Sequence, residues 1–218
     1  MDTSTLDARP FYRGAEADLL ISAVDQWKTV IKRRTKKNYR QESLDNSIRR
    51  ERTFSEADAL HQAKVAGAKV PSIIGIEPET NSLLMTQIVG TVLRNCLDKM
   101  SRTIATRLFE SLGAEMGLLH SAGIVHGDLT TSNIIVTESG TPFIVDFGMS
   151  QRSVDPEDRG VDLHLLHRSI TTSHVKNVAP LIKALGKGYT ETAGEAICKS
   201  SWAKARDIAR RGRYFAIR

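Results

Sequence analysis

Two short apolar runs, at residues 134–136 and 143–145, constrain the fold of this chain most strongly. The Gly-Thr-Pro at residues 140–142 separates them, and this turn chemistry predicts a small antiparallel hairpin. A polar cluster stands on each side: His-Gly-Asp-Leu-Thr-Thr-Ser-Asn at 126–133 before the hairpin, and Asp-Phe-Gly at 146–148 after it. Because the outer ends of a hairpin lie side by side, the two clusters are predicted to be neighbours.

The spacing within these clusters predicts phosphoryl transfer. Asp128 lies five residues before Asn133 and eighteen residues before Asp146. Kinase catalytic loops place an aspartate at this distance from an asparagine, and a second aspartate opens an Asp-Phe-Gly motif. In that arrangement Asp128 would orient or deprotonate the acceptor hydroxyl, while Asn133 and Asp146 would hold Mg²⁺ on the phosphates of ATP. All three side chains supply the hard oxygen atoms that Mg²⁺ prefers.

Kinase chemistry also needs a strand lysine that reaches the phosphates and a glutamate on the next helix that pairs with it. Lys32 ends a short apolar strand pattern, and Glu56 lies 24 residues later in a predicted helix. Other lysines occur nearby, so a surface role for Lys32 stays open. The same helix region offers other acids: Glu42, Glu51 and Asp58.

The phosphate-covering loop departs from the usual kinase pattern. Where a Gly-x-Gly-x-x-Gly would let backbone N–H groups approach the phosphates, the chain has only Gly-Ala-Glu-Ala at residues 14–17. There is no Walker A motif, only about a dozen residues separate Asp146 from the next predicted helix, and no Ala-Pro-Glu follows. These departures argue against an ordinary protein kinase with a docking platform for peptides.

Apolar patterning predicts an α+β chain. Its first half should hold a helix at 44–66 between strands at 17–24, 29–31, 73–76 and 82–88. The second half is predicted to be mainly helical, because apolar residues recur at helical spacing between an N-cap at Ser101 and Gly123: Ile104, Leu108, Leu112, Met116 and Leu119.

Further helices are predicted at 158–172, 175–189 and 194–211. We therefore expect an N-terminal lobe over 1–88, a C-terminal lobe over 89–209 that contains the catalytic loop, and a basic tail over 210–218. The net charge is +6, and residues 199–218 alone carry seven basic residues and one acid, so the remainder of the chain is balanced.

Composition excludes several classes of protein. The 218 residues are 40% apolar and 26% charged, which suits a globular chain of one domain or two small lobes. No apolar run reaches the roughly 18–20 residues of a membrane span, and the first twenty residues lack the apolar core of a secretion signal. Cys96 and Cys198 lie far apart without a CxxC, which argues against a disulfide framework. We expect reduced thiols and a cytoplasmic location.

Over nearly its whole length the chain resembles the small atypical kinase and ATPase subunit of the KEOPS tRNA-modification complex, the PRPK type. The Gly-Ala-Glu-Ala and His-Gly-Asp-Leu-Thr-Thr-Ser-Asn motifs are the most specific to that family. The other matching segments occur in family order: Val-Ile-Lys at 30–32, residues 39–40, 44–45, 49–53 and 56–57, Val-Asp-Phe-Gly at 145–148, Pro-Glu-Asp-Arg-Gly-Val-Asp-Leu at 156–163, and Arg-Gly-Arg at 211–213.

The resemblance implies a minimal bilobal protein-kinase-like fold, with a small β-rich lobe, one long helix and a mainly helical second lobe. It implies ATP-dependent phosphoryl transfer or ATP hydrolysis in support of threonylcarbamoyladenosine modification of tRNA, together with weak serine/threonine kinase activity. The implied cofactors are ATP and Mg²⁺. The implied partners are the tRNA threonylcarbamoyladenosine synthase subunit, other KEOPS subunits and tRNA.

The resemblance also assigns roles to single residues. Asp128 would be the catalytic base, Asn133 and Asp146 the Mg²⁺ ligands, Lys32 the phosphate-binding lysine and Glu56 its partner. Nucleotide contacts would come from Gly14, Glu16 and the backbone near Gln87 and Ile88. Partner or tRNA contacts would come from the basic residues of the tail: Arg210, Arg211, Arg213 and Arg218. The tail continues from there as Tyr-Phe-Ala-Ile rather than with more basic residues, which departs from the family.

Two other functions stay open from the residues alone. Small-molecule phosphotransferases of the aminoglycoside and choline kinase type use similar motifs, although they need a larger helical region after Asp146 than the 72 residues present here. A non-catalytic, kinase-shaped scaffold that binds tRNA or protein is the second. The seven basic residues and no acid between Lys28 and Arg40 form either a solvated strand edge or a phosphate-binding surface. Asp162 is expected to anchor the catalytic-loop backbone.

Overall fold

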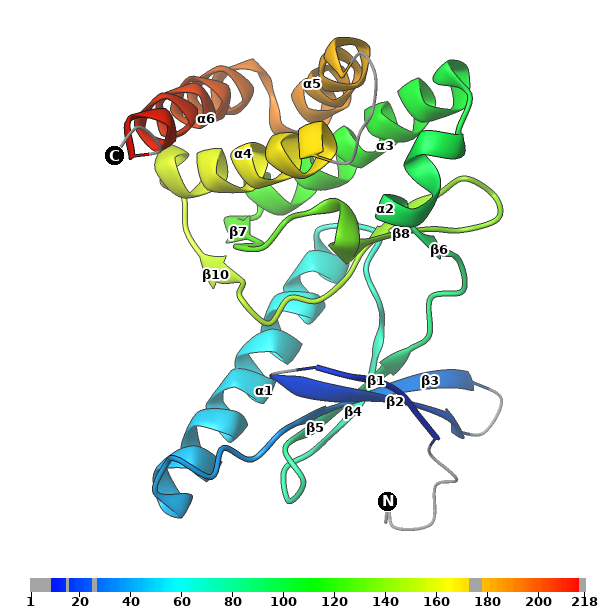
Figure 1. Ribbon diagram of the computed structural model, residues 1–218, viewed down its shortest axis with the longest axis vertical. Helices are drawn as coiled ribbons and strands as arrows, with labels where there is room; N and C mark the ends of the chain where they lie inside the picture. Colours follow the sequence, from blue (N-terminus) through cyan, green and yellow to red (C-terminus); the bar gives the residue numbers. More distant parts are fainter. Residues whose placement is uncertain (1–8, 15, 25–26, 173–177, 216–218) are drawn as a thin grey trace. The chain divides into compact units, whose positions relative to one another are not determined.

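The computed structural model describes residues 9–14, 16–24, 27–172 and 178–215 and divides the chain into two compact units. The first unit contains Met1–His61 and Pro71–Ile88, and the second contains Gln62–Val70 and Val89–Arg218. The predicted α+β class is confirmed, because a small sheet dominates the first unit and helices dominate the second (Figure 1). Residues 62–70, which the sequence-based boundary at Ile88 assigned to the first lobe, belong to the helical unit.

The first unit is built on one antiparallel sheet in the order β1-β2-β3-β5-β4. Its strands are β1 (Arg9–Arg13), β2 (Ala17–Val24), β3 (Trp27–Arg34), β4 (Ile73–Glu77) and β5 (Ser82–Thr86). Strand β1 was not predicted. It contains Pro10, and its pairing with β2 is irregular between Pro10 and Tyr12. Proline has no backbone N–H to donate to a neighbouring strand, so it is tolerated here because β1 lies at the edge of the sheet.

Helix α1 (Glu42–Val65) follows β3 and begins two residues before its predicted start. Its buried positions recur at helical spacing and include Thr53, Glu56, Ala57 and Leu60. Successive side chains of a strand alternate between its two faces, so Lys32 and Arg34 of β3 share one face. That common face and Glu56 of α1 make up the polar core of this unit.

Among the described residues, the second unit contains a two-stranded sheet in the order β10-β7, a three-stranded sheet in the order β6-β8-β9, and the remaining helices. Its elements in chain order are β6 (Thr91–Val92), α2 (Leu93–Cys96), the 3₁₀ turn η2 (Leu97–Lys99), α3 (Arg102–Ser121), β7 (Ile124–Val125), the 3₁₀ turn η3 (Thr131–Asn133), β8 (Ile134–Val136), β9 (Pro142–Ile144), β10 (Gln151–Arg152), α4 (Pro156–Thr172), α5 (Ala179–Ala193) and α6 (Glu195–Phe215).

Helix α3 supplies more buried apolar residues to the core of the second unit than any other helix. Its predicted apolar stripe is buried from Leu108 to Leu119, but Ile104 in its first turn is 56% exposed. Helix α5 packs against α3 at close range, since a Cβ on Gly188 would lie 1.8 Å from the carbonyl oxygen of Glu110. Only glycine allows the two backbones to approach this closely.

The last three helices differ in their ends from the sequence prediction. Helix α4 starts at Pro156, where proline suits a first helical turn. Gly194, with φ of 81°, ends α5 rather than starting the next helix, and residues 175–177 of the predicted helix lie outside the described residues. Helix α6 packs alongside α4 (Figure 1) and continues to Phe215, so the expected tail boundary at residue 210 falls inside a helix. None of the helices described is both long and apolar enough to cross a membrane.

Candidate active site

The β8–β9 hairpin brings the two polar clusters together, as the sequence predicted. Ile134 pairs with Ile144, and one step further the Val145 N–H donates to the Asn133 carbonyl over 3.0 Å. The imidazole of His126 adds a second link, because its Nε2 lies 3.0 Å from the Val145 carbonyl oxygen. The backbone before Asp146 is thus hydrogen-bonded to both ends of segment 126–133.

Asp128 and Asn133 are joined directly. The Asn133 Nδ2 donates to the backbone carbonyl of Asp128 over 2.8 Å and to its carboxylate Oδ2 over 3.0 Å. The 3₁₀ turn η3 folds the chain back between the two residues and makes this contact feasible. Because the amide nitrogen of Asn133 donates to Asp128, its amide oxygen is the atom that can bind a cation. The Asp128 side chain is exposed.

Asp146 has an unusual backbone conformation, with φ of 65°. A non-glycine residue with positive φ costs free energy and persists only where its surroundings hold it. Phe147 provides that hold: it is 1% exposed, and its ring centroid lies 4.8 Å from that of His126. The Gly148 N–H donates to Asp146 Oδ1 over 3.2 Å. An exposed carboxylate is therefore carried on a strained, anchored backbone.

Asp162 of α4 accepts hydrogen bonds from the backbone of the loop that carries Asp128. Its Oδ2 accepts from the His126 N–H over 2.7 Å, and its Oδ1 accepts from the Gly127 N–H over 2.8 Å, which confirms the expected anchoring contact. Gly127 has φ of 78°, and a Cβ there would lie 2.3 Å from the Met149 carbonyl oxygen. Glycine is thus required at the residue before Asp128.

A buried polar chain extends from Asp162 through three further helices. His120 of α3 places Nε2 3.2 Å from Asp162 Oδ2 and Nδ1 2.7 Å from the hydroxyl of Tyr189 on α5. The Tyr189 hydroxyl donates to Ser201 of α6 over 3.3 Å, and Arg159 Nε donates to the same serine over 3.1 Å. Burial raises the pKa of Tyr189 to about 12. Sequence reasoning missed this chain, since no local pattern marks residues so far apart.

The first unit holds the predicted lysine and glutamate together. Lys32 Nζ lies 2.7 Å from Glu56 Oε1, and the two side chains are 9% and 2% exposed. Arg34 was not anticipated: its Nη2 lies 2.7 Å from Glu56 Oε2. Glu56 therefore binds one cation on each oxygen. Strand periodicity could have found Arg34, which lies two residues after Lys32 and so shares its face.

Comparison with known proteins agrees with this geometry. The RIO domain family model matches residues 21–172. The KEOPS complex subunit Bud32 of Pyrococcus abyssi is 36% identical over 208 residues, which cover 93% of this chain and 94% of the relative. The chain belongs to the Bud32 family of RIO-domain proteins.

Longer relatives contain the same unit. A probable bifunctional tRNA threonylcarbamoyladenosine biosynthesis protein of Methanothermobacter thermautotrophicus is 35% identical over 205 residues, covering 93% of this chain. A protein of the same description from Methanoculleus marisnigri is 38% identical over 205 residues. The chain spans only 36% and 35% of those two proteins. A Bud32-type chain can thus be one part of a larger polypeptide.

Three other residues that the family resemblance assigns to nucleotide binding, Gly14, Glu16 and Gln87, have contacts within the first unit. The Gly14 N–H donates to the Ala17 carbonyl over 3.0 Å, and the Glu16 carboxylate pairs with Arg52 at 2.8 Å. The Gln87 N–H donates to the Lys28 carbonyl over 2.8 Å, which commits it to the sheet. Adenine recognition by this segment would then depend on the Gln87 carbonyl and on Ile88.

The basic run from Lys28 to Arg40 is not one uniform surface. Several of its cations have acidic partners: Lys32 and Arg34 bind Glu56, Lys36 binds Glu42, and Arg40 lies 3.5 Å from the buried Asp45. Burial alone would raise the pKa of Asp45, but hydrogen bonds from Arg49 and the Lys37 N–H and the charges of Arg49 and Arg40 lower it overall. Much of the run therefore stabilises the first unit.

Some of the basic residues expected in a tail pair with acidic side chains of α4 and α6. Arg211 of α6 is hydrogen-bonded to Glu157 of α4, and Lys204 lies 3.2 Å from the same carboxylate. The hydrogen bonds from Arg211 and then Lys204 hold the pKa of Glu157 below its ordinary value. Arg210 lies 3.9 Å from Asp207. Arg213 falls within α6, and Arg218 lies outside the described residues.

Proposed function

We propose that this chain transfers or hydrolyses the γ-phosphate of ATP as the kinase-like subunit of a KEOPS complex, in support of threonylcarbamoyladenosine modification of tRNA. The observation that carries the proposal is the Asp128–Asn133 pair, held beside Asp146 by the β8–β9 hairpin. Membership of the Bud32 family supports the same reaction class. The name of the Pyrococcus abyssi relative supports the complex, and the names of the bifunctional relatives support the modification.

The proposed chemistry assigns a separate task to each side chain. Asp128 orients the attacking oxygen, from water in hydrolysis or from a serine or threonine hydroxyl in the weaker kinase reaction, and takes up its proton. The new bond joins that oxygen to the γ-phosphorus, and the bond from the γ-phosphorus to the bridging oxygen breaks as ADP leaves. Asn133 Oδ1 and the Asp146 carboxylate would hold Mg²⁺, which neutralises phosphate charge when bound.

The donor set fits Mg²⁺. Among the residues described, no cluster of three or more histidine, cysteine or acidic side chains is arranged to hold a metal ion. One carboxylate and one amide oxygen suffice for Mg²⁺, because this ion keeps several waters and takes further oxygens from the nucleotide. Asn133 and Asp146 would provide those two atoms from the neighbouring ends of one hairpin.

In the first unit Lys32 would bind the phosphates. Its ammonium lies on Glu56, which in turn keeps Arg34 on its other oxygen. If Lys32 turns toward a phosphate, Glu56 keeps a cationic partner and no buried carboxylate is left unpaired. Gly14, Glu16, Gln87 and Ile88 are proposed to complete the nucleotide contacts.

The longer relatives support the choice of partner. They are described as bifunctional, and this chain matches about a third of their length. We therefore place a tRNA threonylcarbamoyladenosine synthase subunit, corresponding to the remainder of those proteins, beside this chain in a cytoplasmic complex with other KEOPS subunits. The basic end of α6 and the residues after it, including Arg210, Arg211, Arg213 and Arg218, would meet tRNA or this partner.

The test is an ATP hydrolysis assay of the intact chain, alone and with its co-purifying partners and tRNA. Asp128→Asn and Asp146→Asn should each lower turnover by about 10²–10⁴-fold and leave the melting temperature within about 2 °C, because both side chains are exposed. Glu138→Gln is the matched control, an exposed carboxylate at the turn of the same hairpin. Turnover within a fewfold of wild type in both aspartate variants would rule out the assignment. Labelling of serine or threonine in a protein substrate tests the kinase reaction separately.

A further inference from the structure

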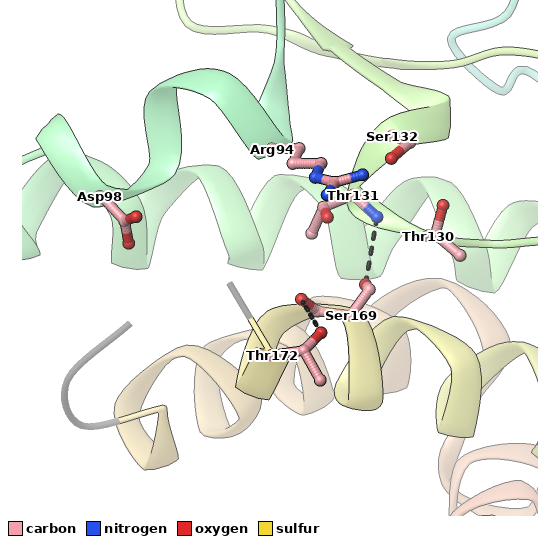
Figure 2. Close-up of a pocket in the computed structure, with 7 residues that line it drawn as sticks. All are labelled: Arg94, Asp98, Thr130, Thr131, Ser132, Ser169 and Thr172. Carbon is pink, nitrogen blue, oxygen red and sulfur yellow. Dashed lines mark hydrogen bonds between the residues drawn. The ribbon is translucent and has the colours of Figure 1, made fainter. Parts of the chain in front are cut away.

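A polar pocket of about 410 Å³ lies beside the proposed catalytic loop, within the second unit. Its walls come from three places: α2 and η2, the loop segment that precedes Asn133, and the C-terminal end of α4 (Figure 2). The lining residues are Arg94, Asp98, Thr130, Thr131, Ser132, Ser169 and Thr172. No apolar side chain is among them, so the pocket suits a ligand that makes many hydrogen bonds.

The α4 wall positions the loop and has no hydroxyl proton left for a ligand. Ser169 Oγ donates to the Leu166 carbonyl over 2.8 Å and accepts from the Thr131 N–H over 3.1 Å. Thr172 donates to the carbonyls of Arg168 and Ser169. Their protons are used within the helix, and Ser169 fixes the backbone of the loop.

The opposite wall is rich in free donors. Within the described part of the chain, the hydroxyls of Thr130, Thr131 and Ser132 donate to no acceptor, and the Arg94 guanidinium has no acidic partner. Figure 2 shows Arg94 extending toward Thr131 and Ser132. A guanidinium with several hydroxyl donors matches a tetrahedral oxyanion, because both groups donate to the oxygens of a phosphate.

Asp98 lies at the other end of the pocket, away from the Arg94 guanidinium (Figure 2). Among the described residues neither side chain has an ion-pair partner, so each is available to a ligand. A carboxylate there would repel a second anion and accept from an amine or a hydroxyl. The pocket is also much larger than one phosphate ion requires, which leaves room for an ester group that carries such a donor.

We propose that this pocket binds a phosphate monoester whose phosphate lies at Arg94 and the hydroxyls of Thr130, Thr131 and Ser132, and whose ester group donates to Asp98. The site deepens the proposed function and rests on it in one respect, the identification of segment 128–133 as the catalytic loop. Thr130 is extended and follows Asp128 by two residues, so the Cα atoms of these two residues are at most about 7 Å apart. The pocket would thus hold a phosphorylated group next to the reacting oxygen.

Isothermal titration calorimetry of the intact chain tests the proposal with two probes, O-phospho-L-serine and inorganic phosphate. O-phospho-L-serine should bind more tightly, since only it has an amine for Asp98. Arg94→Ala should weaken both probes about tenfold or more, the effect of removing a charged hydrogen-bond donor. Asp98→Asn should weaken O-phospho-L-serine and leave inorganic phosphate unchanged or slightly tighter. Arg102→Ala, an exposed arginine of α3 outside the pocket, is the matched control.

The outcomes separate this site from the proposed function. Asp128→Asn should lose turnover and still bind O-phospho-L-serine with wild-type affinity, because Asp128 does not line the pocket. Equal affinity for the two probes, or binding that Arg94→Ala leaves unchanged, overturns the monoester site even if ATP hydrolysis behaves as proposed. Tighter binding of inorganic phosphate than of O-phospho-L-serine would identify a site for the free ion instead and would also overturn it.

Discussion

The charged residues proposed for chemistry are buried in the first unit and exposed in the second. In the first unit, Lys32, Arg34 and Glu56 are at most 9% exposed, and both cations pair with the Glu56 carboxylate. In the second unit, Asp128 and Asp146 are exposed. The loop that carries Asp128 is held by buried groups such as Asp162, which accepts hydrogen bonds from the backbone just before it. Charge is part of the core in the first unit, whereas in the second the core positions charges that remain in solvent.

The difference has an energetic consequence. Removing one member of a buried ion pair leaves the other charge uncompensated in a low-dielectric interior, which is costly. Removing an exposed carboxylate costs little stability, because water already solvates it. Glu56 should therefore matter to folding and Asp128 to turnover, although both belong to the same proposed reaction.

The largest effect on stability is expected from Glu56→Ala. This change leaves Lys32 and Arg34 buried without their carboxylate and should lower the free energy of unfolding by about 3–5 kcal/mol. Urea denaturation followed by circular dichroism measures it. Glu51→Ala, an exposed acid on the same helix, should change stability by less than about 0.5 kcal/mol. An equal loss in the Glu56 and Asp128→Ala variants would abolish the contrast between the units.

A smaller effect is expected from Asp162→Asn, which tests how far the exposed site depends on its buried support. The new amide group would face N–H donors of His126, Gly127 or His120, so stability should fall by about 1–3 kcal/mol. Turnover should also fall, although Asp128 is intact, because the backbone before it loses its acceptor. Asp158→Asn, half-exposed on the same helix, is the control. Full activity in the Asp162 variant would show that the loop holds its geometry without α4.

The smallest effect on stability is expected from Glu115→Gln, which should stabilise the protein at neutral pH, whereas the two changes above destabilise it. The Glu115 carboxylate is also buried, but it accepts a hydrogen bond from the Lys69 N–H at 2.7 Å rather than pairing with a cationic side chain. Burial raises its pKa above the ordinary value, although the Lys69 N–H and charge oppose the shift.

Glu115→Gln keeps an acceptor for Lys69 and removes the buried charge. Below the ordinary pKa of a glutamate both proteins are neutral at this position and should be equally stable. As the pH rises through the raised pKa, the unfolded wild type loses its proton more readily than the folded form, so the wild type should become the less stable of the two. Thermal melts of both proteins across this pH range measure the difference. A variant that is less stable than wild type at neutral pH would contradict this account.

Much of the candidate site was accessible from sequence because it is local. The hairpin, the Asp128–Asn133 spacing and the Asp146-Phe147-Gly148 turn all lie within 23 residues. Short-range turn and strand patterns determine such an arrangement with little help from the rest of the fold. The Lys32–Glu56 pair was also anticipated, but from a known kinase pattern rather than from any local rule.

The prediction was weakest where contacts are long-range. From the sequence, the basic run from Lys28 to Arg40 was compatible with a nucleic-acid-binding surface. In the structure, however, several of its cations bind acidic side chains of α1. The chain from Asp162 to Ser201 joins four helices and had no counterpart in the sequence pattern. The hydroxyls of the pocket were visible in the loop sequence, but Arg94 and the end of α4 were not expected beside them.

The sequence by itself thus determined the α+β class, the hairpin with its two polar clusters and the residues proposed for chemistry, because each depends on spacing along the chain. Only the tertiary structure decided which cations Glu56 binds, how Asp162 supports the loop, and that α6 continues to Phe215 where a separate tail was expected. The physical reason is that partners distant in sequence are chosen by the packing of whole helices and strands, and the burial of a charge follows from that packing rather than from its neighbours in the chain.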